Sequence, residues 1–581
     1  MAAPSGLMLA LQVIKGRWFM VFACLLIMEV AGASYIFGIY SEEIKKKLGY
    51  NQQTLGTISF FKDLGSNLGV VSGLIQEVSA PWLVLLMGAG MNLSGYLMIW
   101  LAVTGRTATP QVWQMCLYIF LGSNSQAFAN TGALVTCVKN FPRSRGVVLG
   151  LLKGLMGLSG AILTQLYHAF YGDDAEALIL LIGWLPTAIS IFFVFSIREI
   201  KASRIPNEIE VFYKFLYIVL VLVAYLMTII IIQKEIKFSM LKYQISAAIV
   251  MVLVFLPLVL VIKEELSIIR NTNQSTANAD SASINVEIEK PRSLAKLSSA
   301  ASASEEQQNK TAMARILDAF RPPPRGEDYT ILQALVSLDM ITLFITSICG
   351  IGGTLAAMDN LGQIGRSLGY PPHGVSTCIS LMSIWNCLGR LTSGFVSETL
   401  LNRHKVPRPL ILTIVLLIAI VGHLLIAFAP PESLYIASVI IGFSFGAQWP
   451  LLFAIISEIF GLKYYSTLYN FGGMASPVGS YILNVLVTGQ LYDKVALRQR
   501  TQTGVITPEL NCTGVECFKL SFLIVAGVTV FGAAVSCILV ARTFSFYRRD
   551  IYAKFREPTG EEVQIKMSDP TFYAITKSQI L

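Results

Sequence analysis

Charged side chains inside long apolar stretches of this chain are the residues best placed to do chemistry. Glu29 lies at the middle of the first such stretch, and Gly32 and Ala33 follow on the same helical face. A charge in a membrane interior costs on the order of 3 kcal/mol on insertion scales, so it needs a function or a partner. We expect Glu29 to face a groove as a proton-coupling carboxylate or substrate contact. The alternative is that Glu29 bonds to a neighbouring helix and has only a structural role.

The second apolar stretch carries an adjacent cation and acid, Lys62 and Asp63. Neighbouring side chains on a helix point about 100° apart, so these two should not face one cavity. Asp63 shares a face with Ser59 and Asn67, which makes it the better candidate for a binding site, with a local ion pair as the alternative. Lys62 lies near the end of its stretch, and its long side chain is expected to reach the lipid headgroups.

Lys153 lies too deep in the fifth apolar stretch to reach the headgroups easily. We expect it either to bind an anionic substrate, the preferred reading, or to pair with a carboxylate such as Glu29 or Asp63. Glycines flank it at a spacing that lets another helix approach closely, which indicates packing rather than chemistry. They are Gly146, Gly150, Gly154, Gly157 and Gly160.

Amide and indole side chains occupy the corresponding stretches of the two halves. The fourth stretch carries Asn124, Gln126 and Asn130, and its counterpart in the second half carries Gln448 and Trp449. Amides give orientable hydrogen bonds and an indole gives a stacking face, which suits a polar solute in a central cavity. Hydrogen bonding between helices is the alternative.

The composition indicates a protein embedded in lipid. Apolar residues make up 54% of the chain and charged residues 14%, whereas a soluble domain has roughly 25% charged residues. The net charge of +9 is spread over the short links between apolar stretches, so we expect no nucleic-acid partner. The nine cysteines lack metal-ligand spacing, and no nucleophile, metal cluster or phosphate loop appears. We therefore expect neither an enzyme nor a bound metal or cofactor.

The apolar stretches fall into groups of six, two and six. Leu48-Gly49-Tyr50 and the stretch after it align with Leu368-Gly369-Tyr370 and its following stretch, which places Gly69 on Gly389. A duplicated unit of membrane-length segments is typical of transporters with two halves around a central site. We predict an all-α polytopic membrane protein of two six-helix bundles and two extra central helices, about 14 spans in total. The predicted spans are Arg17–Tyr40, Leu55–Glu77, Pro81–Val103, Val112–Leu134, Val147–Phe170, Ala177–Ser196, Phe212–Ile232, Tyr243–Ile262, Ile331–Leu355, Val375–Ser397, Pro409–Phe428, Leu434–Ser457, Thr467–Thr488 and Leu520–Ala541.

Lys and Arg residues in the short links decide the expected topology. A cytosolic N-terminus places most of them in the cytosol, as the positive-inside rule requires, and makes both termini cytosolic. Asn511-Cys512-Thr513 is then a glycosylation acceptor in the external loop from Gln490 to Lys519. Cys512 and Cys517 share that loop and are the candidate disulfide. The sequence leaves the membrane open between the plasma membrane, the vacuole and other endomembranes.

The expected organisation has six parts. A Ser-, Ala-, Asn- and Glu-rich segment between the halves cannot bury enough apolar surface to fold, so we predict a disordered cytosolic linker with a short interfacial helix at Ala314–Phe320. The parts are a cytosolic N-terminus (1–16), the N-terminal six-helix bundle (17–200), the extra helix pair (201–262), the linker (263–330), the C-terminal six-helix bundle (331–542) and a cytosolic tail (543–581).

One motif resembles a known superfamily. The run from Gly389 and Arg390 to Glu398, with Arg403 after it, is similar to the loop motif of the major facilitator superfamily, in which glycine, arginine, acid and trailing base lock the cytosolic helix ends. The first-half copy, from Gly69 to Glu77, lacks the basic residues. The resemblance implies a gate at the cytosolic end, formed by Arg390, Glu398, Arg403 and Glu458.

Longer strings resemble plant nodulin-like proteins of the nuclear-fusion-defective type within that superfamily. They are Gly16-Arg17-Trp18, Tyr35 to Ser41, Arg325 to Thr330 and Asp359 to Gly365. Such proteins also look like distant relatives of oxalate/formate and monocarboxylate carriers. The resemblance implies a transporter that moves a small polar solute by alternating access, with an organic anion as candidate substrate and protons as candidate coupling ion. The alternative is a receptor or scaffold that signals through its cytosolic linker.

Overall fold

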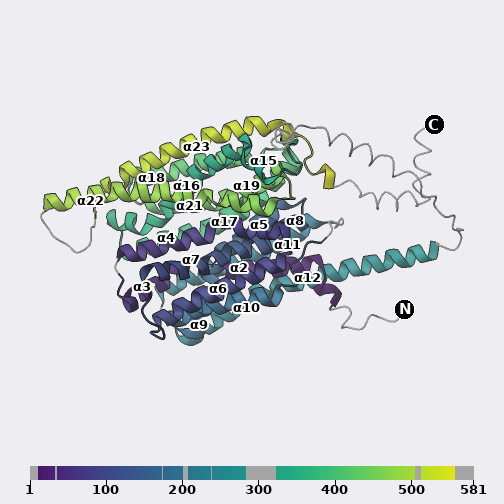
Figure 1. The fold of residues 1–581 in the computed structure, drawn as a ribbon, viewed down its shortest axis with the longest axis horizontal. Helices are drawn as coiled ribbons and strands as arrows, with labels where there is room; N and C mark the ends of the chain where they lie inside the picture. The colour runs from purple at the N-terminus through teal and green to yellow at the C-terminus, as the bar shows by residue number, and fades with distance from the viewer. Residues whose placement is uncertain are drawn as a thin grey trace, which may run out of the picture.

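The computed structural model describes residues 11–32, 36–50, 52–172, 174–200, 207–236, 238–282, 322–503 and 512–555. Within these ranges the regular structure is helical, as an environment without water for the backbone requires. Two bundles lie side by side along the long axis of the molecule, the N-terminal one below and the C-terminal one above in Figure 1.

The N-terminal bundle occupies the purple-to-blue half of Figure 1. Two of its helix ends have clear caps. The Asp174 carboxylate accepts the backbone N–H groups of Glu176 and Ala177 at the start of α10, and Gly49 ends α3 with a φ of 67° that other residues rarely adopt. The elements are α2 (Arg17–Ala31), α3 (Phe37–Leu48), α4 (Gln52–Asn67), α5 (Val70–Val78), α6 (Pro81–Val103), α7 (Val112–Ala129), the π-helix η2 (Asn130–Val135), α8 (Thr136–Asn140), α9 (Arg145–Tyr171) and α10 (Ala175–Phe193).

The C-terminal bundle repeats this order. The Ser337 hydroxyl accepts the Met340 N–H and starts α16, and Pro409 stands in the first turn of α18, where its missing N–H is not needed. The elements are α15 (Ile331–Leu335), α16 (Leu338–Ser367), α17 (Pro372–His404), α18 (Arg408–Phe428), α19 (Ser433–Phe460), α20 (Tyr465–Gly473), α21 (Ala475–Ser480), the π-helix η3 (Tyr481–Gly489), α22 (Gln490–Thr503), α23 (Glu516–Arg548) and the short 3-10 helix η4 (Ala553–Phe555).

Two further helices, α11 (Glu208–Glu235) and α12 (Met240–Ala282), follow the N-terminal bundle. Glu265 of α12 accepts the backbone N–H of Trp18 at 2.8 Å and so caps the start of α2. The Trp18 ring also meets Phe212 of α11 with centroids 5.3 Å apart. On its other side α11 reaches the C-terminal bundle, where the Tyr213 hydroxyl lies 2.9 Å from the Thr399 hydroxyl. The extra pair is therefore packed into the fold.

The structure contains nine helices long and apolar enough to cross a membrane, counted over the described ranges alone. Of the remaining predicted spans, the tenth coincides with the continuous helix α17, and four coincide with helices divided into shorter elements. The first divides into α2 and α3, the second into α4 and α5, the fourth into α7, η2 and α8, and the thirteenth into α20, α21 and η3. Hydropathy averaged over a span does not detect a local break, so these interruptions were not predicted.

Several predicted boundaries are wrong. The linker was expected from residue 263, but α12 continues to Ala282 and projects past the bundle in Figure 1. The ninth span was expected from Ile331, but its membrane helix α16 begins at Leu338 and runs to Ser367, so it includes Asp359. The last helix extends to Arg548 instead of ending near residue 542. The predicted interfacial helix at Ala314–Phe320 lies outside the described residues.

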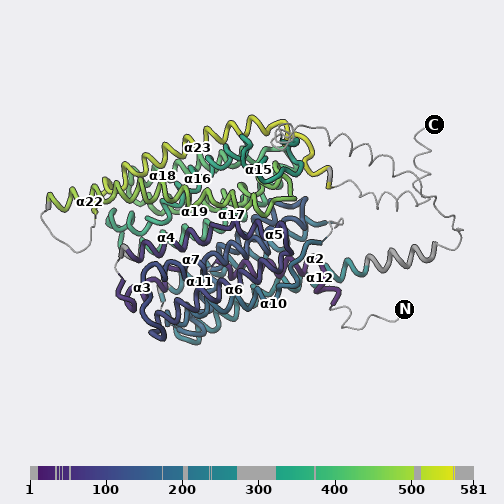
Figure 2. Tube along the Cα trace, viewed as in Figure 1, coloured from purple at the N-terminus to yellow at the C-terminus, as the bar shows by residue number. Residues whose placement is uncertain are grey.

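The backbones of the two bundles approach each other closely at one end of the molecule. A Cβ added to Gly150 of α9 would lie 2.8 Å from the Gly394 Cα of α17, and one added to Gly73 of α5 would lie 2.7 Å from the Thr467 Cα of α20. Figure 2 shows α4 and α5 at the border with the C-terminal bundle. Close backbone approach of this kind needs glycine and gives tight helix packing.

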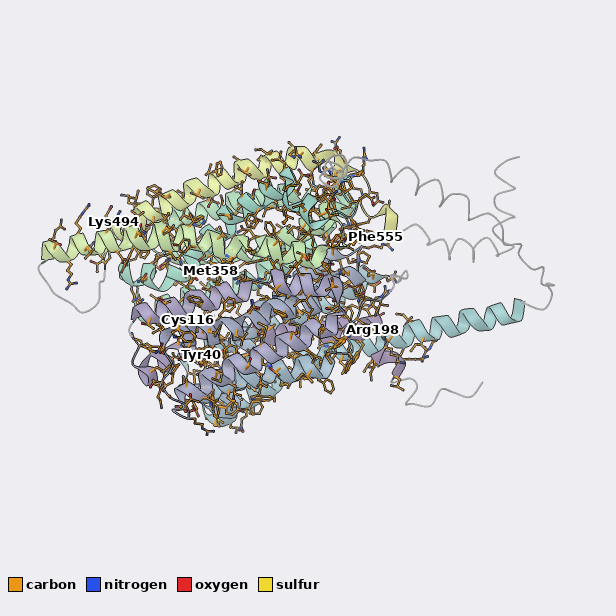
Figure 3. All side chains as sticks on the ribbon, viewed as in Figure 1. Tyr40, Cys116, Arg198, Met358, Lys494 and Phe555 are labelled. Atoms are coloured by element: carbon orange, nitrogen blue, oxygen red, sulfur yellow. A yellow bond between two sulfur atoms is a disulfide. The ribbon has the colours of Figure 1, made fainter. Side chains whose placement is uncertain are left out.

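The seam between the bundles therefore has two different ends. The sealed end contains Arg145, Glu398, Arg408, Glu458 and Tyr552. The wedge end is the opposite one, where Lys62 and Asp63 lie and where the Phe60 and Tyr481 rings, 38% and 47% exposed, face each other with centroids 6.3 Å apart. Figure 3 marks the two directions, with Arg198 and Phe555 toward the sealed end and Lys494 toward the wedge end.

Candidate functional site

The interruption between α4 and α5 opens space at the centre of the seam. Asn124 of α7 holds the broken helix end, because its Nδ2 donates to the carbonyl oxygens of Gly65 and Leu68, each at 2.8 Å. A Cβ on Gly69 would meet the Asn470 side-chain oxygen, so a larger residue there would displace that amide. Asn124 was predicted to line the cavity. The structure instead gives it the interhelical hydrogen bonds that were the alternative.

A central cavity of about 40 Å³ lies where this break meets the C-terminal bundle. Asn130 stands at its wall as the first residue of the π-helix η2, a helix irregularity that often occurs at functional sites. The wall takes residues from both bundles, and none of those described is an Asp or Glu: Ser66, Asn67, Gln126, Ala127, Asn130, Lys153, Met156, Arg390, Trp449, Phe453, Tyr469, Asn470 and Gly473.

Lys153 presents a buried ammonium group to this cavity. The residue is 5% exposed, and its Nζ donates to the Asn130 Oδ1 at 3.2 Å. The ammonium lies 5.6, 5.1 and 5.3 Å from the ring centroids of Trp449, Phe453 and Tyr469. Each ring face attracts a cation by about 0.5–2 kcal/mol. Glu29 and Asp63, the predicted acidic partners, are not paired with Lys153 in the described structure.

Arg390 is the second cation of the cavity. It is 1% exposed, its Nε donates to the Asn386 Oδ1 at 3.0 Å, and its Nη1 donates to the Lys153 carbonyl oxygen at 2.9 Å. Arg390 was predicted to belong to the gate; the structure places it at the central cavity, where it bridges α17 to α9. Two cations without an acid in the lining make the cavity suitable for a carboxylate or another small anion.

Gln448 and Trp449 are adjacent in α19 but face different surroundings. Trp449 lines the cavity, and its Nε1–H finds no hydrogen-bond acceptor among the described residues, so it is a donor available to a ligand. Gln448 turns away and donates to Thr354 and Ser444, while its amide packs on Gly350 of α16. Gln448 therefore joins helices, and Trp449 shapes the site.

A second cavity of about 90 Å³ continues from the first toward the wedge end. It shares Gln126 and Trp449 with the central cavity, and both Lys62 and Asp63 line it. The prediction that these neighbours could not face one cavity is wrong. The Lys62 Nζ pairs with the Asp63 Oδ1 at 3.0 Å. The local ion pair named as an alternative for Asp63 is thus present.

Glu29 is buried in α2, with 3% of its surface exposed. Its Oε2 accepts no hydrogen bond from the part of the chain that the structure describes. It lines neither the central nor the wedge-end cavity. The Glu29 carboxyl group is therefore not part of the wall of either cavity.

The sealed end is centred on Arg408, which the sequence did not indicate as a gate residue. Its Nη2 binds the Glu398 Oε2 at 2.6 Å, and its Nε binds the Glu458 Oε1 at 2.7 Å, with all three side chains buried. The bundles are joined there because Glu398 also accepts the Gly146 N–H at 2.9 Å and Arg145 donates to the Ser457 carbonyl at 2.6 Å.

Arg403 is exposed and takes no part in this cluster. Sequence spacing favoured Arg403 because it follows the acid within the motif. Arg408 was not among the predicted gate residues. The signal that could have found it is its position as the first residue of α18, directly before Pro409, where a side chain can reach back into the bundle.

Comparison with known families covers both bundles. The Nodulin-like family model matches residues 17–262, and the model described as the NFD4 C-terminal domain matches residues 328–549. The chain is a nodulin-like protein of the NFD4 type. The Nodulin-like match ends within α12, so it includes the extra helix pair along with the N-terminal bundle.

Individual relatives agree with the family. This nodulin-like protein is 22% identical over 544 residues to Protein NUCLEAR FUSION DEFECTIVE 4 of Arabidopsis thaliana, covering 92% of this chain and 90% of the relative. It is 27% identical over 183 residues to Probable transporter MCH1 of Yarrowia lipolytica, covering 30% of this chain and 36% of the relative. Among solved structures it is similar to the major facilitator proton:xylose symporter XylE, with a TM-score of 0.51, 10% identity and coverage of 89% and 94%. The fold is that of the major facilitator superfamily.

The nodulin-like protein also uses the first-half copy of the gate motif. Glu77 of α5 accepts the Thr467 N–H at 3.2 Å, near the start of α20. Glu398 of α17 does the same for Gly146 at the start of α9. A carboxylate at a helix N-terminus is stabilised by the unsatisfied N–H groups there. The acid of each copy therefore holds a helix of the opposite bundle.

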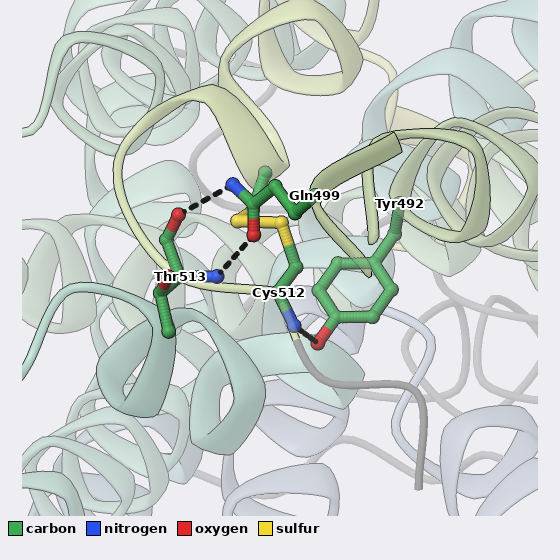
Figure 4. Close-up of a disulfide and its surroundings, with 5 residues drawn as sticks. Tyr492, Gln499, Cys512 and Thr513 are labelled. Atoms are coloured by element: carbon green, nitrogen blue, oxygen red, sulfur yellow. Dashed lines mark hydrogen bonds between the residues drawn. A yellow bond between two sulfur atoms is a disulfide. The ribbon is translucent and has the colours of Figure 1, made fainter. Parts of the chain in front are cut away.

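A disulfide closes the loop beyond the wedge end of this nodulin-like protein. Cys512 and Cys517 are bonded, and Figure 4 shows the bond beside α22. The Tyr492 hydroxyl accepts the Cys512 N–H at 3.1 Å, and Gln499 exchanges two hydrogen bonds with the Thr513 backbone, at 2.8 and 3.0 Å. The predicted glycosylation acceptor Asn511 lies outside the described residues.

Proposed function

We propose that this nodulin-like protein carries a small organic anion across a membrane through the central cavity. The observation that carries the proposal is the pair of buried cations, Lys153 and Arg390, in a cavity wall without a described acid. Trp449 adds a donor, and Asn130 holds the Lys153 ammonium in place. A carboxylate that entered would gain charge-assisted hydrogen bonds worth about 1.5–3 kcal/mol each.

The bundles give this site access to one side at a time. The cavities continue toward the wedge end, whereas the Arg408 cluster closes the sealed end. Rocking of the bundles about the seam would close the wedge end and open the sealed end. We assign the sealed end to the cytosol. The positive-inside distribution of Lys and Arg supports this orientation, and so does the disulfide at the opposite end, because disulfides persist in oxidising compartments.

Glu29 is our candidate for proton coupling. A buried carboxyl group without a described partner is far cheaper to hold in lipid as the neutral acid than as the anion. A proton taken up there in one conformation and released in the other would couple anion movement to a pH gradient. Glu29→Gln should then leave anion exchange at equal pH intact while removing uphill uptake driven by a pH gradient.

Uptake into liposomes containing the purified protein tests the proposal. Labelled oxalate, formate and lactate are compared with xylose and with a neutral amino acid. We expect at least one carboxylate to enter and Lys153→Met to reduce its uptake at least about tenfold, since losing 1.4 kcal/mol of binding corresponds to a factor of ten.

Lys494→Met is the matched control, because Lys494 is exposed on α22, far from the cavity. It should transport as the wild type does. Uptake of xylose or the amino acid alone, with no effect of Lys153→Met, would contradict the anion site. A protein that is folded but moves no solute would contradict transport itself.

A further inference from the structure

A third cavity, of about 630 Å³, lies beside the seam and has no role in the proposed transport path. Its walls come mainly from α9 of the N-terminal bundle, α17 of the C-terminal bundle and the extra helix α11, with smaller contributions from α3, α12 and α16. The cavity is far larger than the central one, which is about 40 Å³. Exposed residues on its wall, Ile379 and Ser383 among them, show that the cavity opens at the protein surface, so a molecule from the surroundings can enter it.

The cavity exists because α9 and α17 diverge. At Gly150 the two helix backbones touch, and a Cβ on Gly154 would lie 2.7 Å from the Leu391 side chain. At Gly157 the nearest atoms are already 3.7 Å away. Beyond this residue the helices separate, and α11 covers the gap from the side, with Leu226 among its lining residues. The extra helix pair thus adds a third wall to the seam and makes it a chamber that remains open on part of its surface.

Polar groups gather at the wedge end of this chamber. Gln165 of α9 and Gln233 of α11 exchange two hydrogen bonds of 2.9 Å, and the His168 ring stacks on Tyr243 with centroids 5.0 Å apart. These four residues lie near the ends of α9 and α11 and the start of α12. The described lining contains no Asp, Glu, Lys or Arg.

Aliphatic residues line the rest of the chamber. Leu158, Val223 and Ile384 face it deeper in the membrane, whereas Ile39 and Ile379 remain 41% and 47% exposed although they line it. Apolar surface of this kind is stabilised by contact with hydrocarbon rather than with water. The chamber therefore has an apolar body and an uncharged hydrogen-bonding end that lies toward one membrane surface.

We propose that the chamber binds one lipid with an uncharged hydroxyl head, a sterol or an acylglycerol. The head is held among Gln165, Gln233, His168 and Tyr243, and the apolar part lies between α9, α11 and α17. The absence of described charged residues from the lining disfavours an anionic phospholipid. The polarity of the chamber also matches the bilayer, whose polar surface lies at the same end as the proposed head group.

This lipid would be connected to the central site. Asn386 lines the chamber and accepts the Arg390 Nε–H at 3.0 Å, while Arg390 lines the central cavity. The lipid would also hold α9 and α17 apart at the wedge end, which favours the conformation closed at the sealed end. This regulatory consequence rests on the proposed transport function; lipid binding itself does not.

The test uses the full-length protein in nanodiscs with a photoreactive sterol, followed by mass spectrometry of the labelled peptides. We expect labelling of α9, α11 and α17. Ser383→Trp, which fills the chamber from an exposed position on α17, should reduce labelling at least about tenfold, the factor that corresponds to 1.4 kcal/mol. Leu417→Trp is the matched control, because Leu417 is 52% exposed on the lipid-facing surface of α18, and it should label as the wild type does.

Competitors identify the lipid. Unlabelled sterol and diacylglycerol are compared with an anionic phospholipid, and competition by either of the first two supports the proposal and names the source. Competition by the anionic lipid alone, or equal labelling of wild type and Ser383→Trp, would overturn it. If Ser383→Trp does not fold, Gln233→Leu serves instead, with the same tenfold loss expected. Anion stabilisation of the wild type, measured in parallel, separates failure of lipid binding from failure of the transport proposal.

Discussion

The two copies of the gate motif show what the duplicated fold keeps and what it changes. In both copies an acid at the end of one helix accepts a backbone N–H near the start of a helix in the opposite bundle: Glu77 for Thr467, and Glu398 for Gly146. Only the second copy adds a buried arginine, Arg408. Helix capping across the seam is therefore the shared function of the motif. The ion-pair cluster is an addition that makes one side of the sealed end much stronger.

Among the substitutions that test this comparison, removal of Arg408 should lower the stability of the protein most. Arg408→Leu leaves Glu398 and Glu458 buried without their shared cation. Breaking a buried ion pair from one side costs about 3–5 kcal/mol. We expect a large fall in the thermal unfolding temperature of the purified protein and reduced expression.

The triple variant Arg408→Leu, Glu398→Gln, Glu458→Gln is the control. It removes both orphaned charges and should recover much of the lost stability, because a neutral cluster leaves no buried charge unpaired. If Arg408→Leu alone is as stable as the wild type, the cluster does not stabilise the sealed end.

The tail residue Tyr552 should have a smaller effect. Its hydroxyl donates to the Glu458 Oε1 at 2.7 Å, and the Arg145 guanidinium lies 5.8 Å from its ring. A hydrogen bond to a charged group contributes about 1.5–3 kcal/mol, so Tyr552→Phe should destabilise by less than Arg408→Leu does. The measurement is again thermal unfolding, with the exposed Tyr217→Phe on α11 as a control that should change nothing.

The same residue predicts a dependence on pH. Burial, together with the nearby Glu398 and Glu458 carboxylates, raises the pKa of the Tyr552 hydroxyl well above its usual value of about 10. The stability that this raised pKa contributes is complete below pH ~10 and is lost as the pH rises toward the folded-state pKa. Tyr552→Phe should therefore reduce the loss of stability in alkali, and an unchanged profile would contradict the raised pKa.

Substitution of the acid in the first copy of the motif should have the smallest effect on stability. Glu77 is half-buried and has no arginine partner in the described structure, so Glu77→Gln removes mainly the interaction of a charge with a helix N-terminus, about 0.3–1 kcal/mol. Glu398→Gln, measured beside it, should cost more because Glu398 also binds Arg408. Equal effects of the two substitutions would mean that capping, not the ion pair, dominates both copies.

A gain-of-charge variant sharpens the same point. Ala80-Pro81 at the start of α6 corresponds to Arg408-Pro409 at the start of α18, so Ala80→Arg copies the missing base into the first half. Ala80 is exposed, and exposed ion pairs contribute about 0–1 kcal/mol. We expect little stabilisation in thermal unfolding, and a gain as large as the loss in Arg408→Leu would contradict the importance of burial.

The repeat, the helical class and the membrane character could be predicted from sequence because they depend on long averages of hydropathy and on aligned glycines. Lys153 could be identified because it lies too deep to reach the headgroups, a local property. What failed depended on side-chain reach or on tertiary contact. Lys62 pairs with its neighbour Asp63, Arg390 lies at the centre of the seam, and the guanidinium of Arg408 reaches into the bundle from the start of α18.

Breaks in the helices were missed for a related reason. The end of α4 is stable because Asn124, distant in sequence, satisfies the carbonyl groups of Gly65 and Leu68. No pattern within the α4 stretch encodes that partner. The third cavity was equally hidden, since it requires three helices from different parts of the chain to be placed before the space between them is visible.

Because the Trp18 backbone N–H donates to Glu265, the extra helix pair cannot be deleted without affecting the N-terminal bundle. Excising α11 and α12 to obtain a protein of the two bundles alone would remove the cap of the first helix. The aromatic partner of Trp18, Phe212, would be lost with it. During synthesis, at roughly 5–20 residues per second, the N-terminal end of α2 therefore stays uncapped until Glu265, about 250 positions later, has been made.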